Sequence, residues 1–121
     1  MQETLHNTQG RTIAYIDYSD DNTIYLWNGT PTGYLDSDNR IYGFNGKHLG
    51  WYEDGILWDL NGNRTGFNKQ SLPVFAKFGP FKSFKQFKPF KSFKEFAKYK
   101  PLKSNACSDS DLSNYLMLGI N

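Results

Sequence analysis

A strict three-residue repeat near the C-terminus constrains the fold of this 121-residue chain more than any other feature. From position 75 to position 102, every third residue is aromatic or aliphatic. This aromatic column is Phe75, Phe78, Phe81, Phe84, Phe87, Phe90, Phe93, Phe96, Tyr99 and Leu102. The column that follows it is mostly lysine: Lys82, Lys85, Lys88, Lys91, Lys94, Lys100 and Lys103. The third column holds Pro80, Pro89 and Pro101 among Ser83, Gln86, Ser92 and Ser104.

A period of three excludes the two common secondary structures. An α-helix advances about 100° per residue, so the aromatic column would wind around the whole helix. In a β-strand, alternate members of the column would fall on opposite faces. Polyproline II has three residues per turn, which makes each column a straight stripe, and it tolerates the prolines. We therefore predict a polyproline-II-like arm over residues 74–104. One coil of β-helix and a disordered, low-complexity tail are the alternatives, and the many aromatic residues argue against the tail.

The small net charge of +2 conceals a division along the chain. Residues 1–73 contain five Lys/Arg and nine Asp/Glu, whereas residues 74–104 contain nine Lys and one Glu. An acidic body beside a basic arm indicates one of two arrangements. Either the arm binds a polyanion, or it docks on an acidic body, in its own chain or in another.

The first 73 residues form a second repeat, of longer period. Turn glycines at positions 10, 29, 46 and 62 follow runs of aromatic and β-branched residues, and three of them follow Asn. Asn-Gly favours a two-residue type I′ turn, in which both central residues have positive φ. We predict four β-hairpins in an all-β, pseudo-fourfold domain with an aromatic-rich core. The equivalent positions of its repeats are Tyr15, Tyr34, Trp51 and Phe67.

Part of this repeat resembles a known family. The run IYGFNGKHLGW at residues 41–51, followed by GILWDLNG at residues 55–62, is similar to the small bacterial domain called the four-fold β flower. The resemblance covers about residues 4–68 and implies four hairpins around a pseudo-fourfold axis. It implies no catalytic residues, because the family has no assigned activity. The first repeat departs from the pattern, with Gln9 in place of Asn and Ala14 in place of Gly.

The last segment, residues 105–121, is predicted to be a linker followed by a short amphipathic helix within residues 108–118. Ser and Asp at its start are favoured N-cap residues, and Gly119 is suited to its end. Leu112, Tyr115 and Leu116 would share one face. The helix either docks on a partner surface or is a frayed terminus.

Few residues have the chemistry of an active site. His6 and His48 occupy non-equivalent repeat positions, so we interpret them as structural rather than as zinc ligands. Cys107, the single cysteine, has no evident base beside it and allows no internal disulfide. Asp17, Asp36 and Glu53 recur two residues after the repeat aromatic. They could bind a cation or act as an acid–base pair, although we favour a solvated edge or pairing with arm lysines. We expect no enzyme activity, no cofactor and no metal.

The arm is therefore the best functional candidate. We predict a self-assembly module in which the aromatic column is buried between subunits or against the body. The interface residues are Phe78, Phe81, Phe84, Phe87, Phe90, Phe93 and Phe96. The alternative is binding of nucleic acid or an anionic membrane through Lys82, Lys85, Lys88, Lys91 and Lys94. Glycan binding by Trp27 and Trp51 is a third interpretation. With no signal pattern and no run of transmembrane length, we expect a cytoplasmic homo-oligomer.

Overall fold

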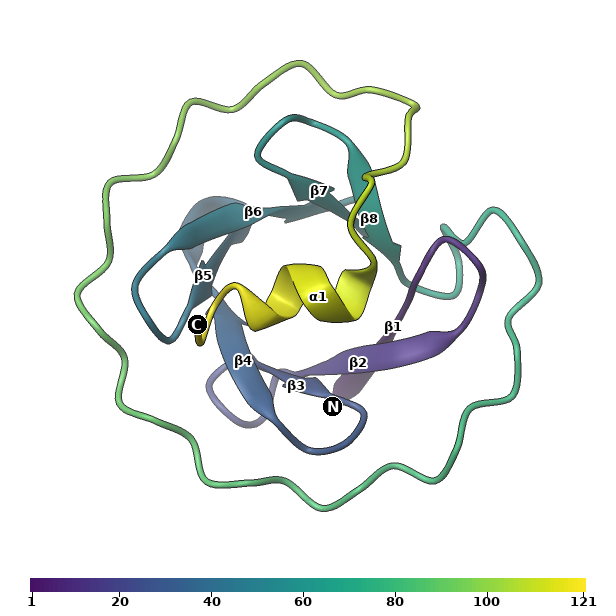
Figure 1. Cartoon of the computed structure of the whole chain (residues 1–121), viewed down its shortest axis with the longest axis horizontal. Coiled ribbons are helices and arrows are strands. Elements are labelled where there is room, and N and C mark those ends of the chain that lie inside the picture. The colour runs from purple at the N-terminus through teal and green to yellow at the C-terminus, as the bar shows by residue number, and fades with distance from the viewer.

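The computed structural model describes all residues, 1–121, and its strands close into one antiparallel barrel (Figure 1). Each strand pairs with its neighbours in sequence, and β1 also pairs with β8. The strands are β1 (Gln2–His6), β2 (Thr12–Asp17), β3 (Thr23–Leu26), β4 (Pro31–Leu35), β5 (Arg40–Gly43), β6 (His48–Glu53), β7 (Ile56–Asp59) and β8 (Arg64–Phe67). A short 3₁₀ segment, η1 (Ser37–Asn39), lies between β4 and β5. The predicted all-β fold of four hairpins is confirmed.

The turn chemistry differs from the prediction. Each of the four turn glycines has positive φ, but the residue before it does not, so these are not type I′ turns. Each hairpin instead has a register shift beside its turn, and a glycine in this conformation is typical of a bulged hairpin. Consecutive residues with positive φ occur between the hairpins, at Asp21-Asn22, Asp38-Asn39 and Asp54-Gly55. Asp and Asn tolerate this conformation because their short polar side chains bond to the local backbone.

The barrel wall separates aliphatic from aromatic side chains. Its interior is filled mainly by aliphatic residues, among them Leu5, Ile16, Ile24, Ile41 and Leu57, all fully buried. Most aromatic residues lie on the outer face, because successive strand residues point to opposite sides. The predicted aromatic-rich core is therefore wrong. The repeat aromatics pair across the junctions between hairpins, as Tyr15–Tyr25, Tyr34–Tyr42, Trp51–Trp58 and Phe67–His6. Their fourfold equivalence is confirmed, including the divergent first repeat.

The C-terminal helix closes the interior. α1 (Leu112–Met117) lies across the middle of the barrel in Figure 1 and is capped by Asp111, whose carboxylate accepts from the Ser113 N–H. Leu112, Tyr115 and Leu116 are buried in the same cluster as the strand aliphatics. The predicted helix and its apolar face are confirmed, but the surface that it contacts belongs to its own barrel. No helix of this chain has the length and hydropathy that a membrane span would need.

The arm, residues 74–104, encircles the barrel as a single extended turn of chain (Figure 1). It contains neither helix nor strand. After the full circuit the chain returns to its starting side, where Cys107 pairs with Arg64 of β8. The arm is thus a belt that leaves the barrel at β8 and comes back to β8.

Candidate interaction surface on the arm

The third column of the arm fastens it to the barrel through the backbone. Six of its N–H groups donate to carbonyl oxygens in or beside the hairpin turns, at 2.8 to 3.0 Å. The pairs are Lys77 to Gly10, Ser83 to Trp27, Gln86 to Gly29, Ser92 to Phe44, Glu95 to Gly46, and Ser104 to Gly62. A seventh, Lys98, donates to Nδ1 of His48 at 3.0 Å. The three prolines occupy the remaining positions of this column, where no N–H is needed.

These contacts repeat every nine residues of the arm. The carbonyls of Phe75, Phe84, Phe93 and Leu102 lie directly against the turn glycines Gly10, Gly29, Gly46 and Gly62, where a Cβ atom would collide with them. The N–H donors Lys77, Gln86, Glu95 and Ser104 reach the same four glycines. Three arm triplets therefore match one hairpin, and the fourfold symmetry of the barrel extends to the arm.

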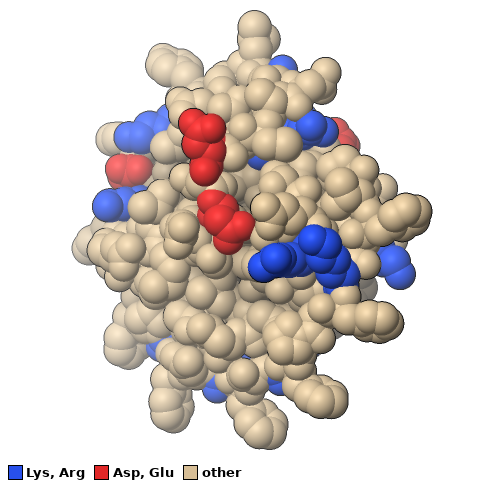
Figure 2. All heavy atoms as spheres, turned by 45° about the vertical axis from the view of Figure 1, so that its right-hand side comes forward, with Lys and Arg blue, Asp and Glu red and all other residues tan.

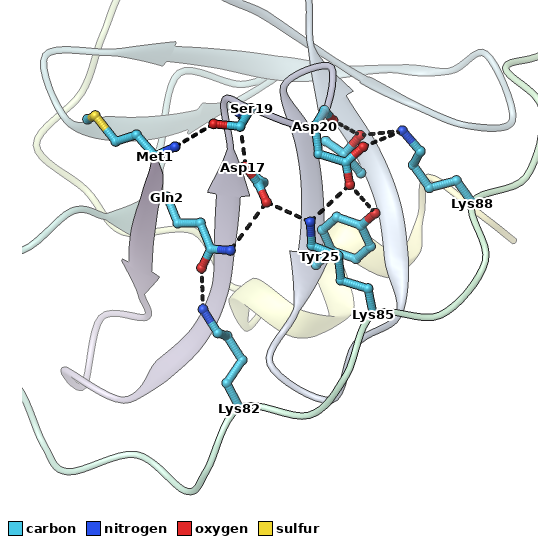
Figure 3. A network of polar contacts seen from close by, with 10 residues as sticks. Met1, Gln2, Asp17, Ser19, Asp20, Tyr25, Lys82, Lys85 and Lys88 are labelled. Atoms are coloured by element: carbon cyan, nitrogen blue, oxygen red, sulfur yellow. Dashed lines mark hydrogen bonds and ion pairs between the residues drawn. The ribbon is translucent and has the colours of Figure 1, made fainter.

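The lysine column points inward, to carboxylates at the ends of the strands. Lys85 bridges Asp17 and Asp20 at 2.6 and 3.1 Å, and Lys88 reaches Asp20 at 2.7 Å. Lys82 bonds Gln2, so one continuous network joins the arm to β1, β2 and the following turn (Figure 3). The same contact recurs with the nine-residue spacing. Lys94 pairs with Asp36 at 2.7 Å and Lys103 with Glu53 at 2.8 Å, while Lys91 pairs with Asp21 and Lys100 with Glu53.

Five of the seven lysines also lie over an aromatic ring of the outer barrel face. The Nζ atom of Lys82 lies 4.4 Å from the Tyr15 ring centroid, and that of Lys91 lies 4.2 Å from the Tyr34 centroid. Lys85, Lys94 and Lys103 lie over Tyr25, Tyr42 and Trp58 in the same way. The aromatic layer is thus covered by lysine stems, and the ammonium groups gain cation–π contacts as well as carboxylates.

The electrostatics agree with this pairing. Hydrogen bonds from Lys100 and Lys103 lower the pKa of Glu53 to about 2. The pKa of Asp20 is lowered well below its usual range, mainly by Lys88 and Tyr25. A hydrogen bond with Asp17 raises the pKa of Lys85 in turn. Four of the five lysines predicted as an alternative polyanion site, Lys85, Lys88, Lys91 and Lys94, are therefore paired with carboxylates of their own chain, which an anionic ligand would have to displace, and Lys82 bonds the Gln2 amide.

The aromatic column points outward around the whole belt. We call its ten side chains, Phe75 to Leu102 as given above, the apolar ring. Each of them is between 93% and 108% exposed in the single chain. Uncharged side chains stand out from the outline of the molecule in Figure 2. The predicted packing of this column against the body is therefore wrong. The arm can turn only two of its three columns to the barrel. Because the barrel offers carboxylates and turn carbonyls, the lysine column and the column of N–H donors face it, and the aromatic column faces outward.

The other residues singled out in the sequence have structural roles. His48 is buried and hydrogen-bonded on both ring nitrogens, as the structural interpretation requires. Asp17, Asp36 and Glu53 pair with arm lysines, which was one of the two favoured interpretations. No cluster of His, Cys, Asp and Glu has the arrangement of a metal site. Trp51 is buried, so the predicted glycan binding is wrong for that side chain, while Trp27 is partly exposed and its N–H donates to the Pro80 carbonyl at 2.7 Å.

A hollow with a volume of about 360 Å³ lies at the helix end of the barrel. Leu49, Asp59 and Tyr115 are among its lining residues. The Asp59 carboxylate already accepts two N–H groups of its own hairpin turn, from Asn61 and Asn63 at 2.9 Å. The hydroxyl of Tyr115 donates to the Leu49 carbonyl. These polar groups hold the turn and the helix in place, and they form no nucleophile–base pair.

The sequence contained a signal for the nine-residue register that period three obscures. FGPFKSFKQ at residues 78–86 is followed directly by FKPFKSFKE at residues 87–95. Proline recurs at the same place in both units, and so does Ser, the residue whose N–H reaches the barrel. Comparing the arm with itself at a spacing of nine would have revealed this repeat.

Comparisons with known proteins give the final evidence. A search of curated proteins and a search of solved structures found no match. A family model described as "4-fold beta flower protein" matches residues 3–116. This range extends well past the hairpins and includes the belt and most of α1, so arm and barrel are matched as one unit. The chain belongs to the four-fold β flower family.

Proposed function

We propose that this protein is a non-enzymatic assembly module whose apolar ring packs against the rings of other copies. The observation that carries the proposal is the full exposure of ten consecutive members of one apolar column. Large aromatic side chains present about 150–250 Å² each, so the ring exposes on the order of 1,500 Å² or more. The largest apolar patch of an ordinary monomer is about 300–600 Å². A surface of this size calls for a partner.

The course of the chain supports the same conclusion. Leu112, the first residue of α1, lies against Gly66, one residue from the end of β8, so a short loop would have joined the last strand to the helix. The 31 residues of the belt are therefore not needed to connect them. Its inner side fastens it to the barrel, and its outer side carries the apolar ring. Compared with a short loop, the belt adds one feature, which is the outward-facing apolar ring.

Charge and symmetry favour a second copy as the partner. Identical surfaces repel one another when they carry unpaired charge of one sign. Here six of the seven lysines of the column are paired with barrel carboxylates, so two rings can meet with little of that repulsion. Each nine-residue unit carries the same apolar pattern, so a contact made by one sector can be repeated by the next. A standard interface takes about 800 Å² from each partner, and the ring has area for more than one neighbour.

The test is the mass of the full-length protein in solution, measured by sedimentation velocity over a wide range of concentration. Changing Phe84, Phe87 and Phe90 together to Ser should reduce self-association, because it removes one sector of the ring. The matched control changes Ser83, Gln86 and Ser92 to Ala, which leaves the ring intact and should leave the mass unchanged. Both variants should unfold at nearly the wild-type urea concentration, since neither set packs inside the barrel.

Two results would overturn the proposal. One is a wild-type protein that stays monomeric at every concentration tested. The other is an assembly whose mass is the same with and without the three Phe side chains. A monomer that co-sediments with zwitterionic phosphatidylcholine vesicles would reassign the ring to a lipid surface. A monomer that binds single-stranded DNA with a steep salt dependence would instead favour the lysine column as the site.

A further inference from the structure

His48 is the one side chain that accepts a hydrogen bond from the arm backbone. The other six arm N–H groups bonded to the barrel reach backbone carbonyls. His48 is 1% exposed, its Nδ1 lies 3.0 Å from the Lys98 nitrogen, and its Nε2 lies 3.0 Å from the Gly50 carbonyl oxygen. The Lys98 N–H can only donate and the carbonyl can only accept. The imidazole must therefore be neutral, with its proton on Nε2.

The register of the belt makes this fastening unique to one sector. Nine and eighteen residues before Lys98 stand Pro89 and Pro80, which have no N–H to donate. The barrel positions equivalent to His48, two residues after each turn glycine, are Thr12, Pro31 and Arg64. Only the part of the belt beside the β5–β6 hairpin therefore combines an arm N–H at this position with a titratable acceptor on the barrel.

The groups around the imidazole define its response to pH. Tyr42 and Trp51 pack against the ring, with centroids 5.2 and 4.7 Å away. Three charged groups act on it, namely Arg40 from β5 and Glu95 and Lys98 from the arm. Burial is the largest influence and lowers the pKa of His48, and the two cations act in the same direction. The Gly50 carbonyl and the Glu95 carboxylate oppose them without cancelling the effect.

We propose that His48 is a pH-sensitive latch, and that its protonation frees the arm around Lys98 from the barrel. A proton added at Nδ1 occupies the lone pair that accepts the Lys98 N–H, so two donors then face each other. The contacts of the neighbouring Glu95 do not involve the imidazole and stay in place, because its carboxylate accepts the backbone N–H of His48 at 2.8 Å and its carbonyl accepts the Tyr42 hydroxyl at 3.0 Å. The freed segment follows Glu95 and carries Phe96 and Tyr99.

The direction of the effect follows from linkage. When the pKa of a histidine is lower in the folded state than in the unfolded state, the histidine stabilises the fold at pH values above its unfolded pKa of about 6.5. That contribution is lost as the pH falls from about 6.5 through the lowered pKa. The latch is therefore closed at neutral pH and opens on mild acidification. Any effect of opening on self-association rests on the function proposed above.

Hydrogen exchange of the full-length protein, followed by NMR between pH 7.5 and pH 4.5, tests the latch. After correction for intrinsic exchange rates, the protection of the Lys98 amide should fall at least tenfold below pH 6.5. Ser83 and Gln86, which bond to the carbonyls of Trp27 and Gly29, should keep theirs. His48→Asn retains an acceptor near Nδ1 but cannot titrate, so its Lys98 protection should not depend on pH. His6→Asn removes the other buried histidine and should behave as wild type.

Three outcomes would overturn the proposal. They are wild-type Lys98 protection that is flat across this range, a fall that persists in His48→Asn, and a simultaneous loss at Gln86, which would indicate general unfolding. If His48→Asn does not fold, the ¹⁵N shifts of the wild-type imidazole decide, and a neutral Nδ1-protonated tautomer would refute the latch. Sedimentation at the same pH values keeps the two proposals separate. Release without a change in mass supports the latch and counts against the ring as the assembly surface in this sector.

Discussion

Replacing Gly29 with Ala tests whether the belt is held by close approach to the hairpin turns. Gly29 has a φ of +93°, and its absent Cβ would lie far inside van der Waals contact with the Phe84 carbonyl oxygen. A side chain in the left-handed region costs about 1–2 kcal/mol. The collision also forces this part of the arm away, which breaks the 2.9 Å bond from the Gln86 N–H to the Gly29 carbonyl. A hydrogen bond of this kind contributes about 0.5–1.5 kcal/mol. We expect Gly29→Ala to lower the free energy of unfolding by about 2–3 kcal/mol.

Gly55→Ala is the matched control. Gly55 also has positive φ, at +77°, but its added Cβ would meet the side-chain amide of Asn68 rather than the arm. Turning the Asn68 side chain away would break its hydrogen bonds with Glu3 and with the Ser71 N–H, but it would not move the arm. Gly55→Ala should therefore lose the conformational part, about 1–2 kcal/mol, together with these bonds, while the arm stays in place. Urea unfolding at pH 7 measures both variants, and an unchanged slope with denaturant would show that the difference lies in stability.

Hydrogen exchange locates the effect on the belt. The Gln86 amide should lose protection in Gly29→Ala and keep it in Gly55→Ala, while the Ser104 amide, bonded to the Gly62 carbonyl, should be unaffected in both. The reasoning is refuted if the Gln86 amide is equally protected in the two variants. That result would mean that the arm does not lie against the turn.

Two further predictions concern the carboxylates that hold the lysine column. The pKa of Glu53 is lowered to about 2, so its ionised form stabilises the fold above its ordinary pKa of about 4.3 and that stability is lost as the pH falls toward 2. The urea midpoint should therefore drop between pH 5 and pH 2.5 in the wild type and drop less in Glu53→Gln, and parallel curves would contradict the pairing. Asp17→Asn should cost about 1–3 kcal/mol, because the Asp17 side chain is 7% exposed and bonds Lys85, Gln2 and the Ser19 N–H. Asp38→Asn, whose side chain is 76% exposed and lies 3.7 Å from Arg40, should cost almost nothing in the same urea titration, and equal losses would show that burial of the carboxylate is not the cause.

The sequence patterns were sufficient to predict where the hairpins and the helix lie, but not which turns have positive φ or which column of the arm faces the barrel. Alternation around the turn glycines predicted the hairpins, and the N-cap and apolar positions predicted α1. The type I′ turns were assigned to Asn-Gly, whereas the structure has them at acidic residues such as Asp21 and Asp38. In the hairpins, Asn28 and Asn45 use their side-chain oxygens to accept the N–H two residues later, at 3.0 Å. That local bond closes the turn with the asparagine outside the left-handed region, so the dipeptide alone was an unreliable guide.

The direction in which the aromatic column points could not be obtained from hydrophobicity. Burying Phe and exposing Lys is the usual preference, and it holds when a segment packs on an apolar surface. The outer face of this barrel offers aromatic rings bordered by Asp17, Asp20, Asp36 and Glu53, and a lysine satisfies both partners at once. A phenylalanine in the same place would leave those carboxylates without their cations. The charge division between body and arm was visible in the sequence, and it correctly indicated docking as one alternative. Whether the lysine column or the aromatic column faces the barrel depended on where the carboxylates lie around it, which the sequence does not show.

The interior of the barrel shows why belt and helix belong to one folding unit. The strands are four to six residues long, and their aliphatic cluster is completed by Leu112, Tyr115 and Leu116 of α1. A segment that supplies part of the core must be tied to the domain, and the belt is the covalent tie. Because the belt is fastened at all four hairpins, loosening one sector leaves the helix anchored through the others. Local release of the arm, as at His48, therefore need not unfold the barrel, and it can change what the apolar ring presents while the core stays closed.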